Sequence, residues 1–477
     1  MMQIITSALN APTTAAPSSS SEPELAALLA IDWADEKHQV LLLPADSEHP
    51  ESFVLEQTPE ALSDWLGQLH QRFGEGKIAL ILEQKRGALI YALLPHTNLV
   101  LYPINPKMSA KIREAFYPSG AKDDPLDTGL MLDILRYHRD RLQAWTPDEP
   151  TTRQLQLVVE SRRRLVADQV RLTNRLRQTL KSYYPQALEL AGEDLASPMA
   201  CAFIQKWPTL QAAQQAKPHL LRKFYYGQGS RSEEQIRRRL ELLAQTKPLT
   251  TDEATIAAQS LLAQSVAREL AVLPAILQEY ERRIKTLFAA HADQAVWTSF
   301  PGAGPVLAPR LAAAWGTQRE RFDSSAAMAA FSGMAPVKVG SGKSLYIAMR
   351  HACPKFVRQS FHEFAACSIR FCIWAHCYYQ SQRDSNKEHH AAVRALGFKW
   401  QRIMFRCWQN HTPYDEAQYI ESLKRSDSKL YARVMAAQAA AKSQQAEAEA
   451  QGLATVNPSS AAATEGVLAQ QQCDLLN

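Results

Sequence analysis

Two strand-like apolar runs near the start of the chain each end on a carboxylate. Leu25–Ile31 is followed by Asp32, and Ile78–Leu82 is followed by Glu83. A carboxylate directly after a buried strand is costly to hide, so it must be paired, hydrated or bound to a cation. For either acid alone, an ordinary strand-end carboxylate is the simpler interpretation. Their combination with a later acidic pair favours a metal site.

That acidic pair is Asp124 and Asp127, at the start of a predicted helix over residues 124–143. A three-residue step places both side chains on one helical face, although the adjacent Asp123 competes with Asp124 for the role of third ligand. Four carboxylates at two strand ends and one helix start would hold two Mg²⁺ ions about 4 Å apart, the geometry that cleaves phosphodiesters. The sequence therefore predicts a metal-dependent nuclease or recombinase.

The element pattern of residues 25–145 predicts an α/β domain. Three hairpin-connected strands are followed by a helix and two further strands: Leu25–Asp32, His38–Leu43, Phe53–Leu55, the helix Pro59–Phe73, Lys77–Glu83 and Asn98–Tyr102. This is the order of an RNase H-like (RuvC-like) fold, so we expect the catalytic domain here. Residues 1–24 are rich in Ser, Thr, Ala and Pro and contain no Lys or Arg, which indicates a disordered leader.

The middle of the chain, residues 146–295, changes to long helical patterns. Arg153–Tyr183 contains no Gly or Pro and carries a leucine seam, and a second long helix is expected near Asp252–Ala290. Basic side chains recur along the first helix at +7 and +4 spacing: Arg164, Arg171 and Arg175. Such a row is either the solvated face of a coiled coil or a stripe that tracks phosphates. We expect a helical, coiled-coil arm that dimerises the protein, binds nucleic acid, or does both.

Residues 296–416 are expected to form a compact, mainly α domain, followed by an Ala/Gln-rich tail over residues 417–477. In the Pro-Gly-Ala-Gly-Pro segment, Gly302 and Gly304 form a turn that would place backbone amides at a helix N-terminus, where a phosphate fits. Further on, Ser341 lies between two glycines and close to Lys343. A serine between glycines is usually part of a flexible turn, but in this basic setting its oxygen would meet a phosphate.

Composition limits the class of protein. The formal net charge of +5 is too small to prove a polyanionic partner, so the distribution of charge must carry that argument. Seven cysteines without a CxxC pair indicate a reducing cytoplasm rather than a disulfide framework. No uninterrupted apolar run reaches the length of a membrane span. We therefore expect a cytoplasmic protein without a membrane partner.

Taken together, these motifs resemble one family, the DEDD transposases of the IS110 type. That family is related to the Piv DNA invertases, and its members are now called bridge-RNA-guided recombinases. The resemblance covers roughly residues 26–416 and rests on the order and separation of the motifs. They are Asp32, Glu83, the Lys-x-Asp-x-x-Asp segment, the Pro-Gly-x-Gly-Pro turn, Phe331–Pro336, the Ser-Gly turn and the late Pro413-Tyr414-Asp415.

The resemblance implies a RuvC-like domain with a Mg²⁺-binding tetrad and a C-terminal transposase domain with a catalytic serine. The tetrad would be Asp32, Glu83, Asp124 and Asp127. Ser341 would attack a phosphate and form a phosphoserine link to DNA. The resemblance also implies a structured non-coding guide RNA, the bridge RNA, that pairs with both donor and target DNA.

The chain departs from the family pattern in two places. The segment after Asp32 reads Trp33-Ala34-Asp35-Glu36-Lys37 instead of a shorter one, and Asp123 stands where Thr is more common. Ser332 and Ser344 are rivals of Ser341 for the role of nucleophile. We favour Ser341, because the serine of the family is followed by Gly.

The leading hypothesis is therefore a transposase, or site-specific recombinase, that cuts and rejoins DNA through a phosphoserine intermediate. It would act as a homo-oligomer, a dimer or a tetramer, with a composite active site between protomers. One alternative is a Mg²⁺-dependent junction nuclease in which water attacks. Another is a non-catalytic scaffold that binds nucleic acid through its basic helices.

Overall fold

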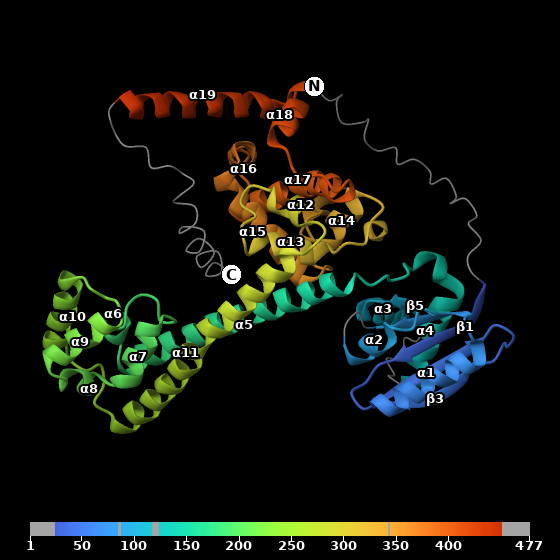
Figure 1. The fold of residues 1–477 in the computed structure, drawn as a ribbon, viewed down its shortest axis with the longest axis horizontal. Coiled ribbons are helices and arrows are strands. Elements are labelled where there is room, and N and C mark those ends of the chain that lie inside the picture. Colours follow the sequence, from blue (N-terminus) through green and yellow to red (C-terminus); the bar gives the residue numbers. More distant parts are fainter. Residues whose placement is uncertain (1–23, 84–86, 117–123, 342–343, 451–477) are drawn as a thin grey trace. The chain divides into compact units, whose positions relative to one another are not determined.

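The computed structural model describes residues 24–83, 87–116, 124–341 and 344–450. The chain divides into two compact units, Met1–Pro147 and Asp148–Asn477, each of which is described by itself (Figure 1). Several sequence predictions fall outside the described residues: the leader, Asp123, Lys343 and the last part of the tail. The side chains of Asp124 and Ser341 are likewise not described, although the backbone of both residues is.

The first unit is built on a five-stranded mixed sheet with the order β3-β2-β1-β4-β5. Its strands are β1 (Leu25–Asp32), β2 (Lys37–Pro44), β3 (Glu51–Glu56), β4 (Lys77–Leu82) and β5 (Leu99–Pro103). The first three strands are antiparallel neighbours, whereas β4 runs parallel to both β1 and β5. The predicted α/β order of hairpin-connected strands, helix and further strands is confirmed.

Helices cover both faces of this sheet, which explains why its central strands are almost continuously apolar. Ala27, Leu29 and Ile31 of β1 pack into one core with α1 (Pro59–Phe73) and α2 (Ala88–Leu93). Ala30, on the opposite face of the same strand, packs against buried side chains of α4. The remaining helices are α3 (Pro106–Phe116), α4 (Asp124–His138) and the 3₁₀ turn Arg139–Arg141.

The second unit is organised around two long helices, α5 (Pro150–Tyr183) and α11 (Glu253–Ala289), which pack against each other along their length. They are antiparallel, because Thr152 Oγ1 lies 3.3 Å from His291 Nε2 and Arg162 pairs with Glu281 at 2.6 Å. Of the predicted leucine seam, Leu176 and Leu180 are buried, and Leu165 and Leu172 pack partly buried against the same core.

One end of the helix pair carries a core closed by five short helices and rich in aromatic side chains. Phe203, Trp207, Phe224 and Tyr225 form a contiguous ring cluster there. The helices are α6 (Ala187–Leu190), α7 (Pro198–Lys206), α8 (Leu210–Gln214), α9 (Pro218–Gly227) and α10 (Glu233–Gln245).

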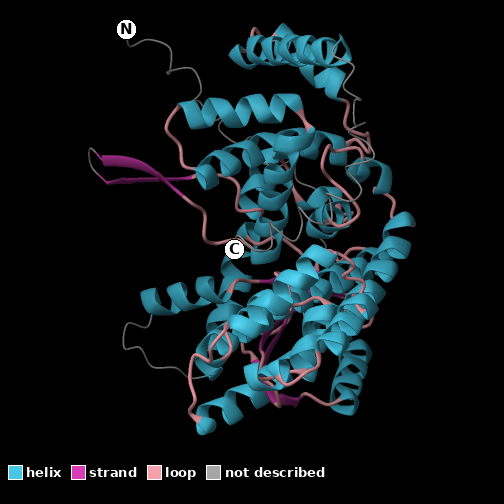
Figure 2. Cartoon of the chain, turned by 90° about the vertical axis from the view of Figure 1, so that its left-hand side faces the viewer, coloured by secondary structure: helices cyan, strands magenta, loops and turns pink. Residues whose placement is uncertain are grey.

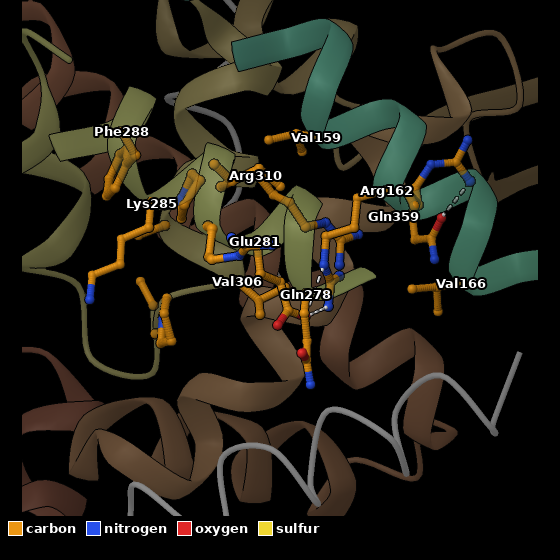
Figure 3. A pocket seen from close by; sticks show the side chains of 18 of the residues that line it. Val159, Arg162, Val166, Gln278, Glu281, Lys285, Phe288, Val306, Arg310 and Gln359 are labelled. Atoms are coloured by element: carbon orange, nitrogen blue, oxygen red, sulfur yellow. Dashed lines mark hydrogen bonds and ion pairs between the residues drawn. The ribbon is translucent and has the colours of Figure 1, made fainter. Parts of the chain in front are cut away.

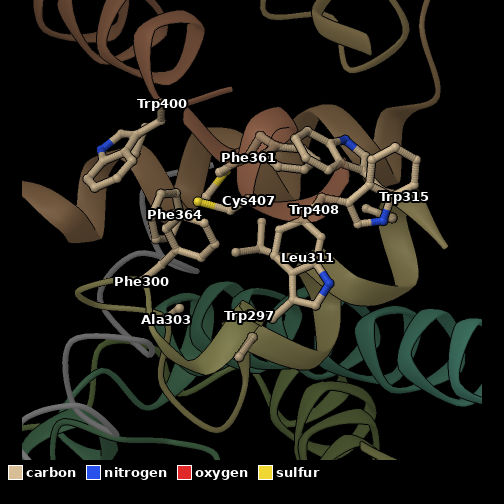
Figure 4. Close-up of a cluster of buried hydrophobic side chains, with 14 of the residues drawn as sticks. Trp297, Phe300, Ala303, Leu311, Trp315, Phe361, Phe364, Trp400, Cys407 and Trp408 are labelled. Carbon is tan, nitrogen blue, oxygen red and sulfur yellow. The ribbon is translucent and has the colours of Figure 1, made fainter. Parts of the chain in front are cut away.

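At the other end the two long helices join a larger, mostly helical core. Buried side chains from α5 and α11 pack there with a group of tryptophans and phenylalanines, drawn in Figure 4. Trp374 and Trp400 lie 4.4 Å apart between ring centroids, and Trp315 stacks on Phe361 at 4.7 Å. The elements are α12 (Gln294–Thr298), α13 (Leu307–Trp315), the 3₁₀ turn Arg319–Arg321, α14 (Ser325–Phe331), β6 (Val337–Ser341), β7 (Ser344–Ala348), α15 (Lys355–Phe371), α16 (Ile373–Asp384), α17 (His389–Gln409), α18 (Glu416–Arg425) and α19 (Lys429–Ala450).

Two details add to what the sequence suggested. The predicted Ser-Gly turn lies at the closed end of an antiparallel hairpin made of β6 and β7, two strands that the sequence did not predict. The first part of the predicted tail is helical and packs on the core through Leu430 and Val434 of α19. Within the described residues, α11 alone is long and apolar enough to cross a membrane by length and composition, yet it packs along α5 and α7 inside the second unit.

Candidate active site and nucleic-acid interface

The parallel register of β1 and β4 places Asp32 and Glu83 at the same edge of the sheet. Ile31 lies opposite Leu82 in this register, and each acid is the next residue along its chain. Asp32 is the last residue of β1, and Glu83 directly follows β4. The carboxyl ends of neighbouring parallel strands meet at one edge, so the two strand-end acids, far apart in sequence, become neighbours in the fold.

Asp127 lies on α4, which packs against β1, β2 and β4 of the same sheet. Its carboxylate is partly buried and accepts a hydrogen bond from Arg113 Nη1 of α3 at 2.5 Å. Asp124 begins the same helix one turn earlier, as the three-residue spacing predicted. Arg113 was not among the predicted site residues, because nothing in its local sequence shows that α3 packs beside α4.

The donor chemistry of these residues fits a hard cation, since carboxylate oxygens are the ligands that Mg²⁺ takes in proteins. In the described structure these residues do not form a complete metal-binding site. Among the residues whose side chains are described, no three His, Cys, Asp or Glu lie close enough together to hold one ion. Asp127 is engaged by Arg113 instead. An ion that used Asp127 would therefore have to compete with this arginine.

Ser341 is the last residue of β6 and lies opposite Ser344 of β7, at the closed end of the hairpin. Figure 2 shows these two strands standing out from the surrounding helices. Ser344 is exposed. Ser332, the other rival, is fully buried, and its Oγ accepts a hydrogen bond from Trp315 Nε1 at 3.1 Å. Ser332 therefore serves as a hydrogen-bonding partner inside the core.

The three arginines of the predicted stripe all lie on the exposed side of α5. Two of them pair with acids of their own helix: Arg164 with Glu160 at 3.3 Å, and Arg171 with Asp168. Arg175 is exposed on the same helix. Exposed pairs of this kind contribute little to stability, so their presence leaves the arginines available to a stronger anionic partner.

The Pro-Gly-Ala-Gly-Pro turn lies between α12 and α13. Gly302 has φ +83°, and a Cβ at this position would lie 3.1 Å from the ring of Phe371, so the turn requires glycine. The amide of Ala308 donates to the carbonyl of Gly304 at 3.0 Å. Pro305 and Pro309 have no N–H at all. Fewer amides are therefore available to a phosphate than the motif alone suggests.

A cavity of about 990 Å³ brings part of the arginine stripe and this turn together. Arg171 of α5 and Gly304 of the turn both line it. Residues of α11 line it as well, among them Glu281 and Lys285 (Figure 3). Five further basic side chains, none of them among the predicted site residues, also line the cavity: Arg162, Arg163, Arg282, Lys285 and Arg310. A usable signal was present for Arg310, since it is the one charged residue in the otherwise apolar helix Leu307–Trp315.

Two family models match this chain. A transposase model of the DEDD IS110 type matches residues 29–185, which include Asp32, Glu83, Asp124 and Asp127. The model of the transposase IS116/IS110/IS902 family matches residues 294–380, which include the glycine turn and the β6–β7 hairpin. The two matches follow one another in the order that the motifs predicted.

Individual relatives extend over most of the chain. The mini-circle putative transposase for IS117 of Streptomyces coelicolor is 24% identical over 418 residues, covering 83% of this chain and 97% of that protein. The insertion element IS900 uncharacterized 42 kDa protein of Mycobacterium paratuberculosis is 24% identical over 81% of this chain and 96% of its own length. The putative transposase y4uE of Sinorhizobium fredii is 30% identical over 34% of this chain and 46% of its own. With both family models and these relatives in agreement, the chain belongs to the IS110-type family of transposases.

Proposed function

We propose that this protein cuts and rejoins DNA through a phosphoserine intermediate, using a carboxylate site in the first unit and Ser341 in the second. The observation that carries the proposal is the β1–β4 register, which gathers Asp32 and Glu83 at one edge of the sheet. The helix with Asp124 and Asp127 packs on the same strands. The strand order β3-β2-β1-β4-β5 supports an RNase H-like (RuvC-like) assignment for this unit.

Asp32, Glu83, Asp124 and Asp127 would hold Mg²⁺, which when bound would offset the negative charge that develops on the phosphate oxygens. Arg113 would control whether Asp127 can bind the cation, because its guanidinium forms an ion pair with the Asp127 carboxylate in the protein alone. Movement of the Arg113 side chain away from Asp127 would release a ligand and would place a guanidinium beside the DNA phosphate.

Ser341 would be the nucleophile. A serine hydroxyl is weakly nucleophilic at neutral pH and must lose its proton to an activating group. Its Oγ would bond to phosphorus while the bond from phosphorus to the 3′-oxygen breaks, and the departing 3′-oxygen would gain a proton. Rejoining reverses the roles, since a 3′-hydroxyl attacks the phosphoserine and the serine leaves. Its place at the closed end of a protruding hairpin suits access to a duplex.

The protein would act as a homo-oligomer, a dimer or a tetramer, in which one protomer's carboxylates meet its partner's serine. Apolar side chains exposed along one face of α11 support a second copy packing there: Leu261, Leu262, Val272 and Ile276. The exposed arginines of α5 would contact donor DNA, target DNA or a guide RNA. Base pairing of the guide RNA with both DNAs would determine where the DNA is cut and rejoined.

The deciding experiment is to trap the reaction on labelled DNA and to run it on a denaturing gel. Wild-type protein should leave a covalent adduct with DNA, and Ser341→Ala should leave none, although it should still bind DNA. Ser344→Ala, a serine directly opposite in the hairpin, is the matched control and should keep the adduct. Cleavage without any adduct would instead favour the junction nuclease, and an Asp32→Ala protein with unchanged properties would favour a non-catalytic scaffold.

A further inference from the structure

The cavity beside the glycine turn contains a polar network that none of the proposed steps uses. Arg310 of α13 is almost fully buried, and its Nη1 donates to Glu363 Oε2 of α15, which is equally buried. Glu363 Oε1 accepts from Gln359 Nε2 at 2.7 Å, and Gln359 Oε1 accepts from Arg163 Nη1 at 3.3 Å. Arg310 therefore pairs directly with the Glu363 carboxylate, and Arg163 is linked to the same carboxylate only through Gln359. Arg310, Gln359 and Arg163 all line the cavity.

Several nitrogens of this network have no hydrogen-bond partner within the described structure. They are Nε and Nη2 of Arg310 and Nε of Arg163, all screened from solvent. A buried donor without an acceptor destabilises the folded protein, more so when it is charged, so such donors point to an acceptor that the protein binds. Burial and the nearby Arg310 lower the pKa of Arg163, as expected for two cations held close together.

These donors suit an anion with two or more oxygen atoms. Nε and Nη2 of one guanidinium lie on the same side of the group and bind two oxygens of a phosphate at once. Arg163 would contribute a third donor. Arg282 and Lys285, which also line the cavity, strengthen this preference for an anion. The one acidic residue among the described lining residues, Glu281, already pairs with Arg162.

The cavity is too large and too apolar for a bare phosphate. Its volume is about 990 Å³, and much of its wall is apolar. The apolar side chains come from α5, α11 and the segment before α13: Val159, Val166, Val170, Ile284, Phe288 and Val306 (Figure 3). A flat ring attached to a phosphate would occupy the apolar part while its phosphate meets the arginines. Nucleotides have this combination of an aromatic base and a phosphate.

We propose that this cavity binds one unpaired nucleotide, with its phosphate on Arg310 and Arg163 and its base against the apolar wall. The inference deepens the proposed function, because an unpaired nucleotide of a DNA or RNA strand is the expected source. A free mononucleotide would present the same chemistry. Specific contacts to single-stranded nucleic acid commonly use such unstacked bases.

The test is a binding titration with the full-length protein in the absence of divalent metal. Two probes are fluorescent small molecules: 2-aminopurine riboside 5′-monophosphate and the same nucleoside without its phosphate. The others are inorganic phosphate and two oligonucleotides that contain 2-aminopurine, one single-stranded and one duplex. We expect the monophosphate to bind about tenfold or more tightly than the nucleoside. If the single strand competes and the duplex does not, the source is an unpaired nucleotide in a strand; if only the monophosphate binds, the source is a free nucleotide.

The decisive variant is Arg310→Lys, which keeps a cation next to Glu363 but removes the side-by-side donors. It should weaken monophosphate binding about tenfold or more. The double variant Arg310→Met with Glu363→Met removes the buried pair together and should give the same loss if Arg310→Lys fails to fold. Arg425→Gln, an equal loss of charge on the exposed end of α18, is the control and should bind as wild type.

Two results would overturn the inference: equal binding of nucleoside and monophosphate, or wild-type binding by both Arg310 variants. Inorganic phosphate that binds as tightly as the monophosphate would also overturn it, since the base would then contribute nothing. Because the titration needs neither cleavage nor metal, its failure is separate from failure of the phosphoserine mechanism. A Ser341→Ala protein should bind the probes normally.

Discussion

The carboxylates of the predicted tetrad differ in how the structure holds them. Asp127 already has a guanidinium partner in Arg113, whereas Asp32 and Glu83 are brought together at the strand ends. Pairing with Arg113 relieves the charge of Asp127 in the protein alone. A cation that used Asp127 would have to displace Arg113, whereas the register of β1 and β4 by itself places Asp32 and Glu83 at one edge of the sheet.

The corresponding prediction concerns Glu83. Glu83→Ala should abolish DNA strand cleavage in Mg²⁺ while leaving the fold intact, because a cation loses a ligand and the remaining carboxylates no longer position it. Cleavage is measured on a labelled duplex, and folding is measured by circular dichroism. Glu56→Ala is the matched control, since Glu56 is another strand-end glutamate, largely exposed and paired with Lys37 at 3.7 Å. Near wild-type cleavage by Glu83→Ala would show that the metal site lies elsewhere.

At the scale of elements, α5 has two distinct faces. Its buried side packs against α11, and its other side presents Arg164, Arg171 and Arg175 to solvent. Periodicity established both faces, but whether the basic face binds a polyanion depends on a partner that no helical pattern can specify.

Neutralising Arg164, Arg171 and Arg175 to Gln should reduce the dependence of nucleic-acid affinity on salt. Each lost phosphate contact removes about one unit from the slope of log affinity against log salt concentration. Fluorescence anisotropy of a labelled duplex at several salt concentrations measures this slope. Arg237→Gln, an exposed arginine on α10, serves as the comparison. An unaltered slope in the triple variant would mean that the stripe is only a solvated helix face.

Helix α15 carries a titratable group that links stability to pH. Burial, together with His390 and Arg394, lowers the pKa of His362 from 6.5 to about 4. Between these two values the unfolded chain binds the proton and the folded chain does not, so the free energy of unfolding falls as pH is lowered from 6.5 toward 4.

His362→Gln should therefore flatten the change in the free energy of unfolding of the second unit between pH 6.5 and pH 4.5. Urea unfolding at several pH values, followed by tryptophan fluorescence, measures it. His49→Gln, at an exposed position in the first unit, should keep the wild-type dependence. An equally steep dependence in both variants would assign the effect to other groups.

At the scale of the whole molecule, the exposed apolar face of α11 has no partner in the described chain. Leu261 is 63% exposed and Val272 is 57% exposed, and their spacing of eleven residues keeps them on one face of the helix. Large apolar side chains gathered on one surface are typical of protein interfaces.

Leu261→Glu combined with Val272→Glu should therefore lower the mass of the assembly in solution, measured by light scattering across a range of concentrations. Charges placed in an apolar interface would remain unpaired there. Val54→Glu, at an exposed apolar position on β3 of the first unit, should leave the mass unchanged. If the double variant keeps the wild-type mass, the copies meet through another surface.

The sequence by itself determined the strands of the first unit, the long helices and the family. Apolar runs such as Lys77–Leu82 and the leucines of α5 report local periodicity, and periodicity depends only on neighbouring residues. The glycine turn could likewise be predicted from the sequence, because Gly302 adopts φ +83°, a backbone conformation that glycine adopts more easily than other residues. The α/β class and the order of its elements followed from these patterns alone.

Only the tertiary structure decided which distant side chains meet. The sequence does not reveal that Arg113 neutralises Asp127, that Ser332 is buried against Trp315, or that Arg310 reaches Glu363. Each of these contacts joins different elements, so it depends on how the helices pack, and packing is settled by the shape of a whole core rather than by any local pattern. The cavity beside the glycine turn arises for the same reason, because its walls come from segments more than a hundred residues apart.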